Sequence, residues 1–195
     1  YTGTGGGKTV GHGLGVAPRV FFMKNRGSAD YNWSVWHADL ATPTTARLGL
    51  NVATAQQNHS SYWNDGVPSA TILNLGSDAG HNANGDTYIA YCFAEKKGYS
   101  KFGTYEGNGI DDGPFIYTGF APAFVMVKCF DQGEHWNIYD NKRGSSLALS
   151  PNLEVADRAM DDSPAMELLS NGFKIRTSDN NLSNAADGFI YMAFA

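Results

Sequence analysis

The glycine-rich segment near the start of the chain is the first place where the sequence could carry out chemistry. Gly5-Gly6-Gly7-Lys8-Thr9 has the lysine and threonine of a phosphate-binding loop, in which backbone N–H groups surround the phosphates. Such a loop also needs a glycine five residues before the Gly-Lys pair, and Thr2 stands there. No strand pattern precedes the segment and no helix-forming run follows it. We therefore interpret it as a flexible turn.

Acidic and histidine side chains offer metal binding or acid–base catalysis, but their spacing does not favour either. The five histidines show no paired metal-ligand spacing. Asp111-Asp112 and Asp161-Asp162 are acidic pairs, yet sequence neighbours do not establish two carboxyl groups that face each other across a sugar. A calcium site at Asp111, Asp112 or Asp179 stays open, although no calcium-loop pattern surrounds them. We predict no catalytic residue, no metal site and no cofactor.

One aromatic pair lies among polar loop residues and has no counterpart later in the chain. Tyr62 and Trp63 are followed by Asn64 and Asp65. Aromatic faces stack on sugar rings, and amide or carboxylate groups bind sugar hydroxyls. We predict that these four residues form a ligand-binding site, with the two rings as the stacking platform. The alternative is a loop tryptophan folded onto the edge of the domain.

Composition and charge exclude two classes of partner. The formal net charge is -5 and the sequence contains no basic stripe, so we predict no nucleic-acid binding. The apolar runs are too short to span a bilayer, so we predict no membrane insertion. Cys92 and Cys129 lack a C-x-x-C spacing, and we interpret them as free thiols of a reducing compartment.

An internal repeat organises the whole chain. Tyr1-Thr2-Gly3-Thr4-Gly5 reappears as Tyr105-Glu106-Gly107-Asn108-Gly109, and later matches follow in the same order to the ends of both halves. Two units result, residues 1–98 and 99–195. Trp33 and Trp136 occupy equivalent places, which predicts a shared role in the core.

Short apolar runs separated by Asn, Asp, Gly and Pro clusters predict an all-β fold. We expect two tandem pseudo-repeated β-sandwich units of the jelly-roll or lectin-like type, and a merged single sandwich stays open. Only residues 154–170 have a helical pattern, which Pro164 interrupts.

Residues 99–104 would be a lead-in strand of the second unit. Since no such strand precedes Tyr1, and the chain ends on an apolar run, we expect a segment of a longer polypeptide.

A set of motifs connects the chain with a known family. They are the Tyr-x-Gly-x-Gly repeats, Gly11 to Pro18, Tyr88 to Glu95 with Gly98 to Gly103, and Leu169 to Lys174. The set resembles a duplicated domain of tail-fibre-like and other virion surface proteins of marine tailed bacteriophages. It covers essentially the whole chain, and its motifs are specific together and weak singly. The resemblance implies a virion protein assembled in bacterial cytoplasm, which fits free thiols, and carries over no catalytic residues.

Residues and resemblance together predict a non-catalytic virion module for host-surface attachment or fibre assembly. Its partners would be copies of itself, with a trimer as the first expectation, and a host cell-surface glycan or protein. A carbohydrate-binding module or adhesin of a bacterium is the alternative. A glycan depolymerase is a third and less favoured interpretation.

Overall fold

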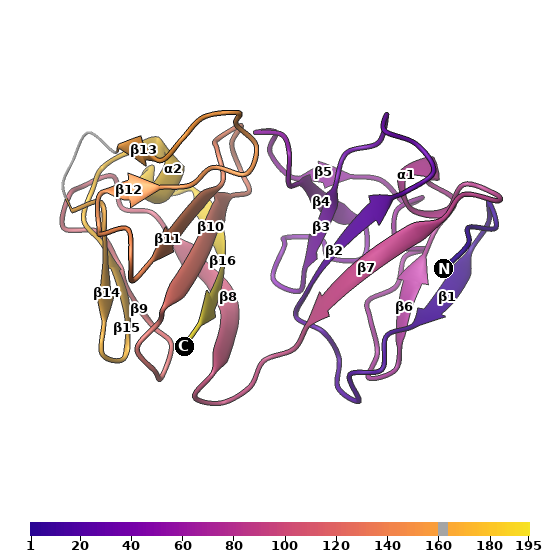
Figure 1. Cartoon of the computed structure of the whole chain (residues 1–195), viewed down its shortest axis with the longest axis horizontal. Helices are drawn as coiled ribbons and strands as arrows, with labels where there is room; N and C mark the ends of the chain where they lie inside the picture. Colours follow the sequence, from indigo (N-terminus) through magenta and orange to yellow (C-terminus); the bar gives the residue numbers. More distant parts are fainter. Residues whose placement is uncertain (160–163) are drawn as a thin grey trace. The chain divides into compact units, whose positions relative to one another are not determined.

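The computed structural model describes residues 1–159 and 164–195, and the protein is mostly β (Figure 1). Strands hold 38% of the residues. Within the described ranges, the helices are two single turns, α1 (Ala79–Asn82) and α2 (Asn180–Ser183). The prediction of a mostly β protein is thus confirmed. The chain divides into two compact units, Tyr1–Ala94 and Glu95–Ala195.

The first unit consists of two antiparallel sheets with its core between them. One sheet has the strand order β5-β4-β3-β2-β7 and the other pairs β1 with β6. Their bounds are β1 (Lys8–Gly11), β2 (Val20–Asn25), β3 (Ser34–His37), β4 (Ala46–Gly49), β5 (Gln57–Asn58), β6 (Ile72–Leu75) and β7 (Tyr88–Phe93). Phe21 and Met23 of β2 alternate with half-buried neighbours, so both point to one face, where Leu73 and Leu75 of β6 meet them.

The second unit repeats this plan and has two more strands within its described residues. Its sheets have the orders β11-β10-β16-β8 and β14-β15-β9, with a short pair of β12 and β13. The bounds are β8 (Ser100–Glu106), β9 (Phe115–Tyr117), β10 (Phe124–Cys129), β11 (Asn137–Asp140), β12 (Leu147–Ala148), β13 (Arg158–Ala159), β14 (Met166–Leu169), β15 (Gly172–Ile175) and β16 (Gly188–Phe194). Val125, Phe173 and Phe189 are fully buried together in its core.

Equivalent tyrosines make equivalent contacts in the two units. Tyr1 stacks on Tyr88 with ring centroids 5.0 Å apart, and Tyr105 stacks on Phe189 at 4.9 Å. Both tyrosines belong to the repeated Tyr-x-Gly-x-Gly motif. That motif therefore marks the point at which a chain segment packs beside the last strand of its unit.

An aspartate caps the start of each single-turn helix. The Asp78 carboxylate accepts the N–H of Gly80 at 3.0 Å, and the Asp179 carboxylate accepts the N–H of Asn181 at 2.8 Å. Side-chain capping of this kind satisfies N–H groups that a helix leaves unpaired at its start. In the sequence, Ser77-Asp78 recurs in the second unit as Ser178-Asp179, and this recurrence marks both caps.

The predicted helical segment at residues 154–170 differs from the structure. Its described part holds the strands β13 and β14, and residues 160–163, which include the Asp161-Asp162 pair, lie outside the described residues. β14 forms because Met166 and Leu168 pair with β15 across the sheet, and this tertiary pairing overrides a local helical pattern. None of the helices in the described ranges is long and apolar enough to cross a membrane.

Candidate functional site

The predicted stacking platform is part of the core of the first unit, which corrects its predicted role. Trp63 is 1% exposed and Tyr62 is 8% exposed. The Trp63 indole N–H donates to the carbonyl of Ala46 at 2.6 Å, and the ring meets Phe21 edge-on at 5.1 Å. A ring enclosed on both faces offers no surface to a sugar. These two aromatic residues hold their loop against the sheet.

Asn64 and Asp65 are exposed, but they do not border an aromatic face. Both have left-handed backbone angles, with φ of 53° and 50°, and the N–H of Gly66 closes the turn onto the carbonyl of Trp63 at 3.0 Å. Asn and Asp tolerate this conformation better than most residues. The turn geometry therefore accounts for these residue types.

The two equivalent tryptophans differ in burial. Trp136 is 2% exposed, which confirms its predicted core role. Trp33 is only half-buried, and it stacks on the exposed ring of Tyr91 at 6.2 Å. The prediction of a core role for Trp33 was wrong, because its ring packs on Tyr91, which is itself 47% exposed. What the two positions share is a backbone N–H bound by an asparagine side chain.

An exposed aromatic face does exist, on the sheet β14-β15-β9 of the second unit. Phe115 and Tyr117 are 45% and 65% exposed, whereas Ile116 between them is buried. Side chains alternate along a strand, so the two rings project from one face of β9. Leu169 on β14 adds exposed apolar surface to this sheet. We call Phe115, Tyr117, Leu169 and Gly172 the aromatic face.

Gly172 lies at the centre of the aromatic face and is itself buried. It pairs with Tyr117 on one side and with Leu169 on the other. A Cβ atom at this position would lie 2.1 Å from the carbonyl oxygen of Ile116 and 3.0 Å from Cζ of Phe115. Since a backbone atom at 2.1 Å leaves no room for a Cβ atom, the position requires glycine. The surface that a ligand could reach here is therefore that of the exposed Phe115 and Tyr117 rings.

Charged side chains border the aromatic face. Lys174 pairs with Phe115 in the strand register, and its ammonium group lies 2.8 Å from the Asp112 carboxylate. The hydrogen bond from Lys174, followed by its charge, lowers the pKa of Asp112. Nε of Arg176 lies 2.7 Å from the Glu167 carboxylate. These groups are donors and acceptors within reach of the rings.

An open cavity begins beside Tyr117. It measures about 530 Å³, and its walls include Glu95, Lys97, Lys101 and Tyr117. Lys101 forms an ion pair of 2.6 Å with Glu95. The cavity is open to solvent. It is lined both by the Tyr117 ring, which is 65% exposed, and by charged side chains. A ligand lying on the aromatic face could extend into it.

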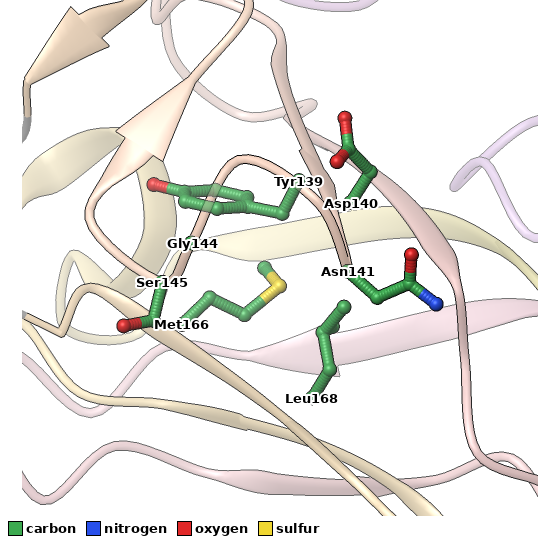
Figure 2. A pocket seen from close by; sticks show the side chains of 7 residues that line it. All are labelled: Tyr139, Asp140, Asn141, Gly144, Ser145, Met166 and Leu168. Atoms are coloured by element: carbon green, nitrogen blue, oxygen red, sulfur yellow. The ribbon is translucent and has the colours of Figure 1, made fainter.

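A second cavity of about 230 Å³ lies between β14 and the loop after β11 (Figure 2). Met166 and Leu168 form its apolar side, and Asp140 and Asn141 carry its polar groups. The Asp140 carboxylate accepts the N–H groups of Lys142 and Arg143 at 2.8 and 3.0 Å, and these bonds lower its pKa. Because the aromatic ring in its lining, Tyr139, is 1% exposed, this cavity is a weaker candidate than the aromatic face.

A serine, a histidine and an aspartate also meet in the first unit. Ser34 Oγ lies 2.7 Å from His81 Nε2, and His81 Nδ1 lies 3.2 Å from the Asp78 carboxylate without hydrogen-bond alignment. Ser34 and His81 are 1% and 0% exposed, and burial with the charge of Arg47 lowers the pKa of His81 to about 3. A substrate cannot reach this serine, and a base with so low a pKa is a poor proton acceptor at neutral pH.

The second unit keeps this arrangement without the histidine. By the repeat, Asn137 replaces Ser34, Leu182 replaces His81, and Asp179 again caps the helix. The Asn137 amide donates to the carbonyl of Asn181 at 3.3 Å, which ties α2 to β11. The shared task of these positions is therefore to hold the helix against the sheet. Among the described residues, no group of three His, Cys, Asp or Glu side chains could hold a metal ion.

A comparison with protein families matches the chain over residues 1–195, to the family described as a domain of unknown function, DUF7483. No curated protein matches the chain, and no solved structure does.

Proposed function

The chain belongs to this family, and we propose that it is a non-catalytic, carbohydrate-binding module of a virion surface protein, which attaches a tail-fibre-like protein to a host-surface glycan. The observation that carries this proposal is the aromatic face, with two exposed rings that project from one strand. The place in a virion rests on the motif resemblance described above.

The chemistry of the aromatic face suits a sugar. The C–H groups on one face of a pyranose pack on an aromatic ring, and its hydroxyl groups need donors and acceptors around the rim. Phe115 and Tyr117 supply the rings, and Lys174 and Glu167 supply the polar groups. The cavity beside Tyr117 would take a neighbouring sugar residue.

The fold beneath the aromatic face holds its two rings in place. We take each unit to be a β-sandwich of the jelly-roll or lectin-like type. Ile116 anchors β9 from below in the same core as Phe173 of β15. A site on paired strands keeps its geometry without a ligand, which reduces the entropy lost on binding.

Two observations support binding without turnover. The Ser34–His81–Asp78 group is buried, and the carboxylates near the aromatic face, Glu167 and Asp112, are engaged in ion pairs with Arg176 and Lys174.

Single sugar sites are weak, and linked copies raise avidity by roughly 10²–10⁴-fold. A homo-oligomer, with a trimer as the first model, would supply such copies.

A glycan array and a panel of host envelope polysaccharides test the proposal. The purified chain should bind a defined subset of glycans and release no new reducing ends during prolonged incubation. Binding to none of them would contradict the glycan assignment. Binding accompanied by sugar release would favour a depolymerase instead.

A further inference from the structure

Three charged side chains line the cavity that begins beside Tyr117, and together they carry one net positive charge. Lys97 and Lys101 contribute two positive charges, and Glu95 contributes one negative charge. The chain as a whole has a formal net charge of -5. The cavity is therefore positive in a protein that is negative overall.

Lys97 lies at the tip of a tight turn that hydrogen bonds hold in place. The carbonyl of Lys96 accepts the N–H groups of Tyr99 and Ser100, both at 2.9 Å, and the Ser100 hydroxyl accepts the N–H of Lys96 at 3.0 Å. Gly98 has a φ of 76°, which glycine adopts without strain. The backbone at Lys97 is thus held by its neighbours, while its side chain is exposed at the cavity.

The two lysines of the cavity differ in their partners. The ammonium group of Lys101 lies 2.6 Å from the Glu95 carboxylate. Lys97 forms no ion pair with any residue in the ranges 1–159 and 164–195. Hydrogen bonds between an ammonium group and an anion are stronger than those between neutral groups. Lys97 therefore favours a ligand that brings an anionic group into the cavity.

The Tyr117 ring is held at the other wall of this cavity by the turn that follows β9. The N–H groups of Thr118 and Gly119 both donate to the carbonyl of Asn171, at 3.0 and 3.2 Å, which ties this turn to the one between β14 and β15. A Cβ atom at Gly119 would lie 3.5 Å from the Tyr117 hydroxyl oxygen and 3.7 Å from its Cε1. The ring therefore packs over Gly119 and keeps the rest of its surface exposed.

An aromatic ring and an unpaired ammonium group in one cavity suit an acidic sugar. The carboxylate or sulfate ester of such a sugar is attached at the rim of the pyranose ring. When the face of the pyranose packs on an aromatic side chain, the acidic group stays at the edge of the stack. Tyr117 would take the face of the sugar, and Lys97 would take the acidic group at its edge.

We propose that this cavity is a subsite for the acidic group of an anionic glycan, in which Tyr117 stacks on the sugar ring and Lys97 binds its carboxylate or sulfate ester. The assignment rests on the proposed function, because it names the class of glycan that the same site takes. Glu95 opposes the charge of such a ligand from within the cavity. Substitutions of Lys97 and Glu95 should therefore have opposite effects on binding.

The test measures binding of the full chain to two matched pairs of oligosaccharides by isothermal titration calorimetry. One pair is an oligogalacturonate and its methyl ester, and the other is a sulfated galactan oligosaccharide and its desulfated form. The unchanged chain is compared with the variants Lys97→Gln, Glu95→Gln and Lys142→Gln. Lys142 is the control, because it is exposed in the same unit and does not line the cavity.

The acidic member of one pair should bind more tightly than its neutral form, and the pair that shows this difference identifies the acidic group. Lys97→Gln should weaken this binding roughly 2- to 5-fold, and Glu95→Gln should strengthen it by a similar factor, as expected for exposed charges. Added salt should reduce both effects by screening. The neutral oligosaccharides should bind all four proteins equally, and Lys142→Gln should change nothing.

Equal binding of the acidic and neutral members of both pairs would overturn the inference, as would an unchanged Kd in Lys97→Gln. Polyglutamate carries carboxylates without a sugar ring, so competition by polyglutamate as strong as that by the oligosaccharide would also overturn it. If the glycan array shows binding to neutral glycans alone, this inference fails and the proposed function stands. If the chain binds no glycan at all, both fail.

Discussion

The ring of Tyr1 lies parallel to the ring of Tyr88, with an interplanar angle of 11°, and its hydroxyl donates to the carbonyl of His81 in α1. One residue thus links the last strand of the first unit to the helix that precedes it. Tyr105 does the same in the second unit, where its hydroxyl donates to the carbonyl of Leu182 at 2.8 Å. The tyrosine of the repeat motif is therefore a structural residue with two tasks, stacking and hydrogen bonding.

Replacing Tyr105 by phenylalanine separates these two tasks. The stack on Phe189 remains, but the buried carbonyl of Leu182 loses its donor. We expect the free energy of unfolding to fall by about 1–3 kcal/mol. Urea denaturation followed by tryptophan fluorescence measures the loss. Tyr105→Leu removes the stack as well and is the comparison, whereas a phenylalanine variant as stable as the unchanged chain would assign the role of Tyr105 to packing alone.

His81 makes the stability of the first unit depend on pH. Its pKa is about 3 in the folded state, below the ordinary value of 6.5. Between these two values the unfolded state binds a proton that the folded state excludes, so stability falls as pH decreases from about 6.5 toward 3. The slope from this residue is at most about 1.4 kcal/mol per pH unit. Above pH 6.5 its contribution is constant.

The variant His81→Leu copies the residue of the second unit and tests this assignment. Its free energy of unfolding should lose the dependence on pH that His81 causes in this window. Denaturant titrations at several pH values between 4 and 7 make the comparison. An unchanged pH profile in the variant would assign the dependence to other groups.

Trp63 should behave as a core residue. Trp63→Ala removes a ring that is 1% exposed, and we expect it to destabilise the first unit by about 3–5 kcal/mol. Calorimetry of the full chain resolves the loss as a lower melting temperature. Trp33→Ala is the matched change at a half-buried ring and should cost clearly less. Equal losses would mean that exposure does not distinguish the two sites.

Tyr117 should contribute to glycan binding without contributing much to stability. Its ring is 65% exposed, so Tyr117→Ala should leave the melting temperature almost unchanged. Loss of a stacked ring worth about 0.5–1.5 kcal/mol would weaken glycan binding roughly 2- to 12-fold. Tyr91→Ala removes a comparably exposed ring from the first unit and is the control. If both variants bind equally well, the aromatic face is not the site.

The fold was more predictable than the site, and the residues show why. The order of the repeat motifs predicts equivalent contacts, and Tyr1 and Tyr105 make them, because their partners Tyr88 and Phe189 are also equivalent positions of the repeat. Trp63 is buried where its indole N–H reaches the carbonyl of Ala46, seventeen residues earlier in the sequence. The polar residues next to Trp63 in the sequence do not indicate that contact. The signal for the aromatic face was Phe115-Ile116-Tyr117, whose outer residues share one side of a strand. Which side is exposed depends on pairing with Gly172, and the sequence does not show that pairing.

The position of β8 has a consequence for how such repeats can be exchanged. The sequence repeat restarts at Tyr105, but the second unit begins at Glu95, and β8 lies mostly before the restart. A recombination event with its breakpoint at Tyr105 would separate β16 from most of its pairing partner. A breakpoint after Ala94 would transfer the strand together with its sheet. The segment that can be exchanged as an intact folded unit therefore begins before the sequence repeat does. Recombined proteins that still fold should have their junctions before Ser100.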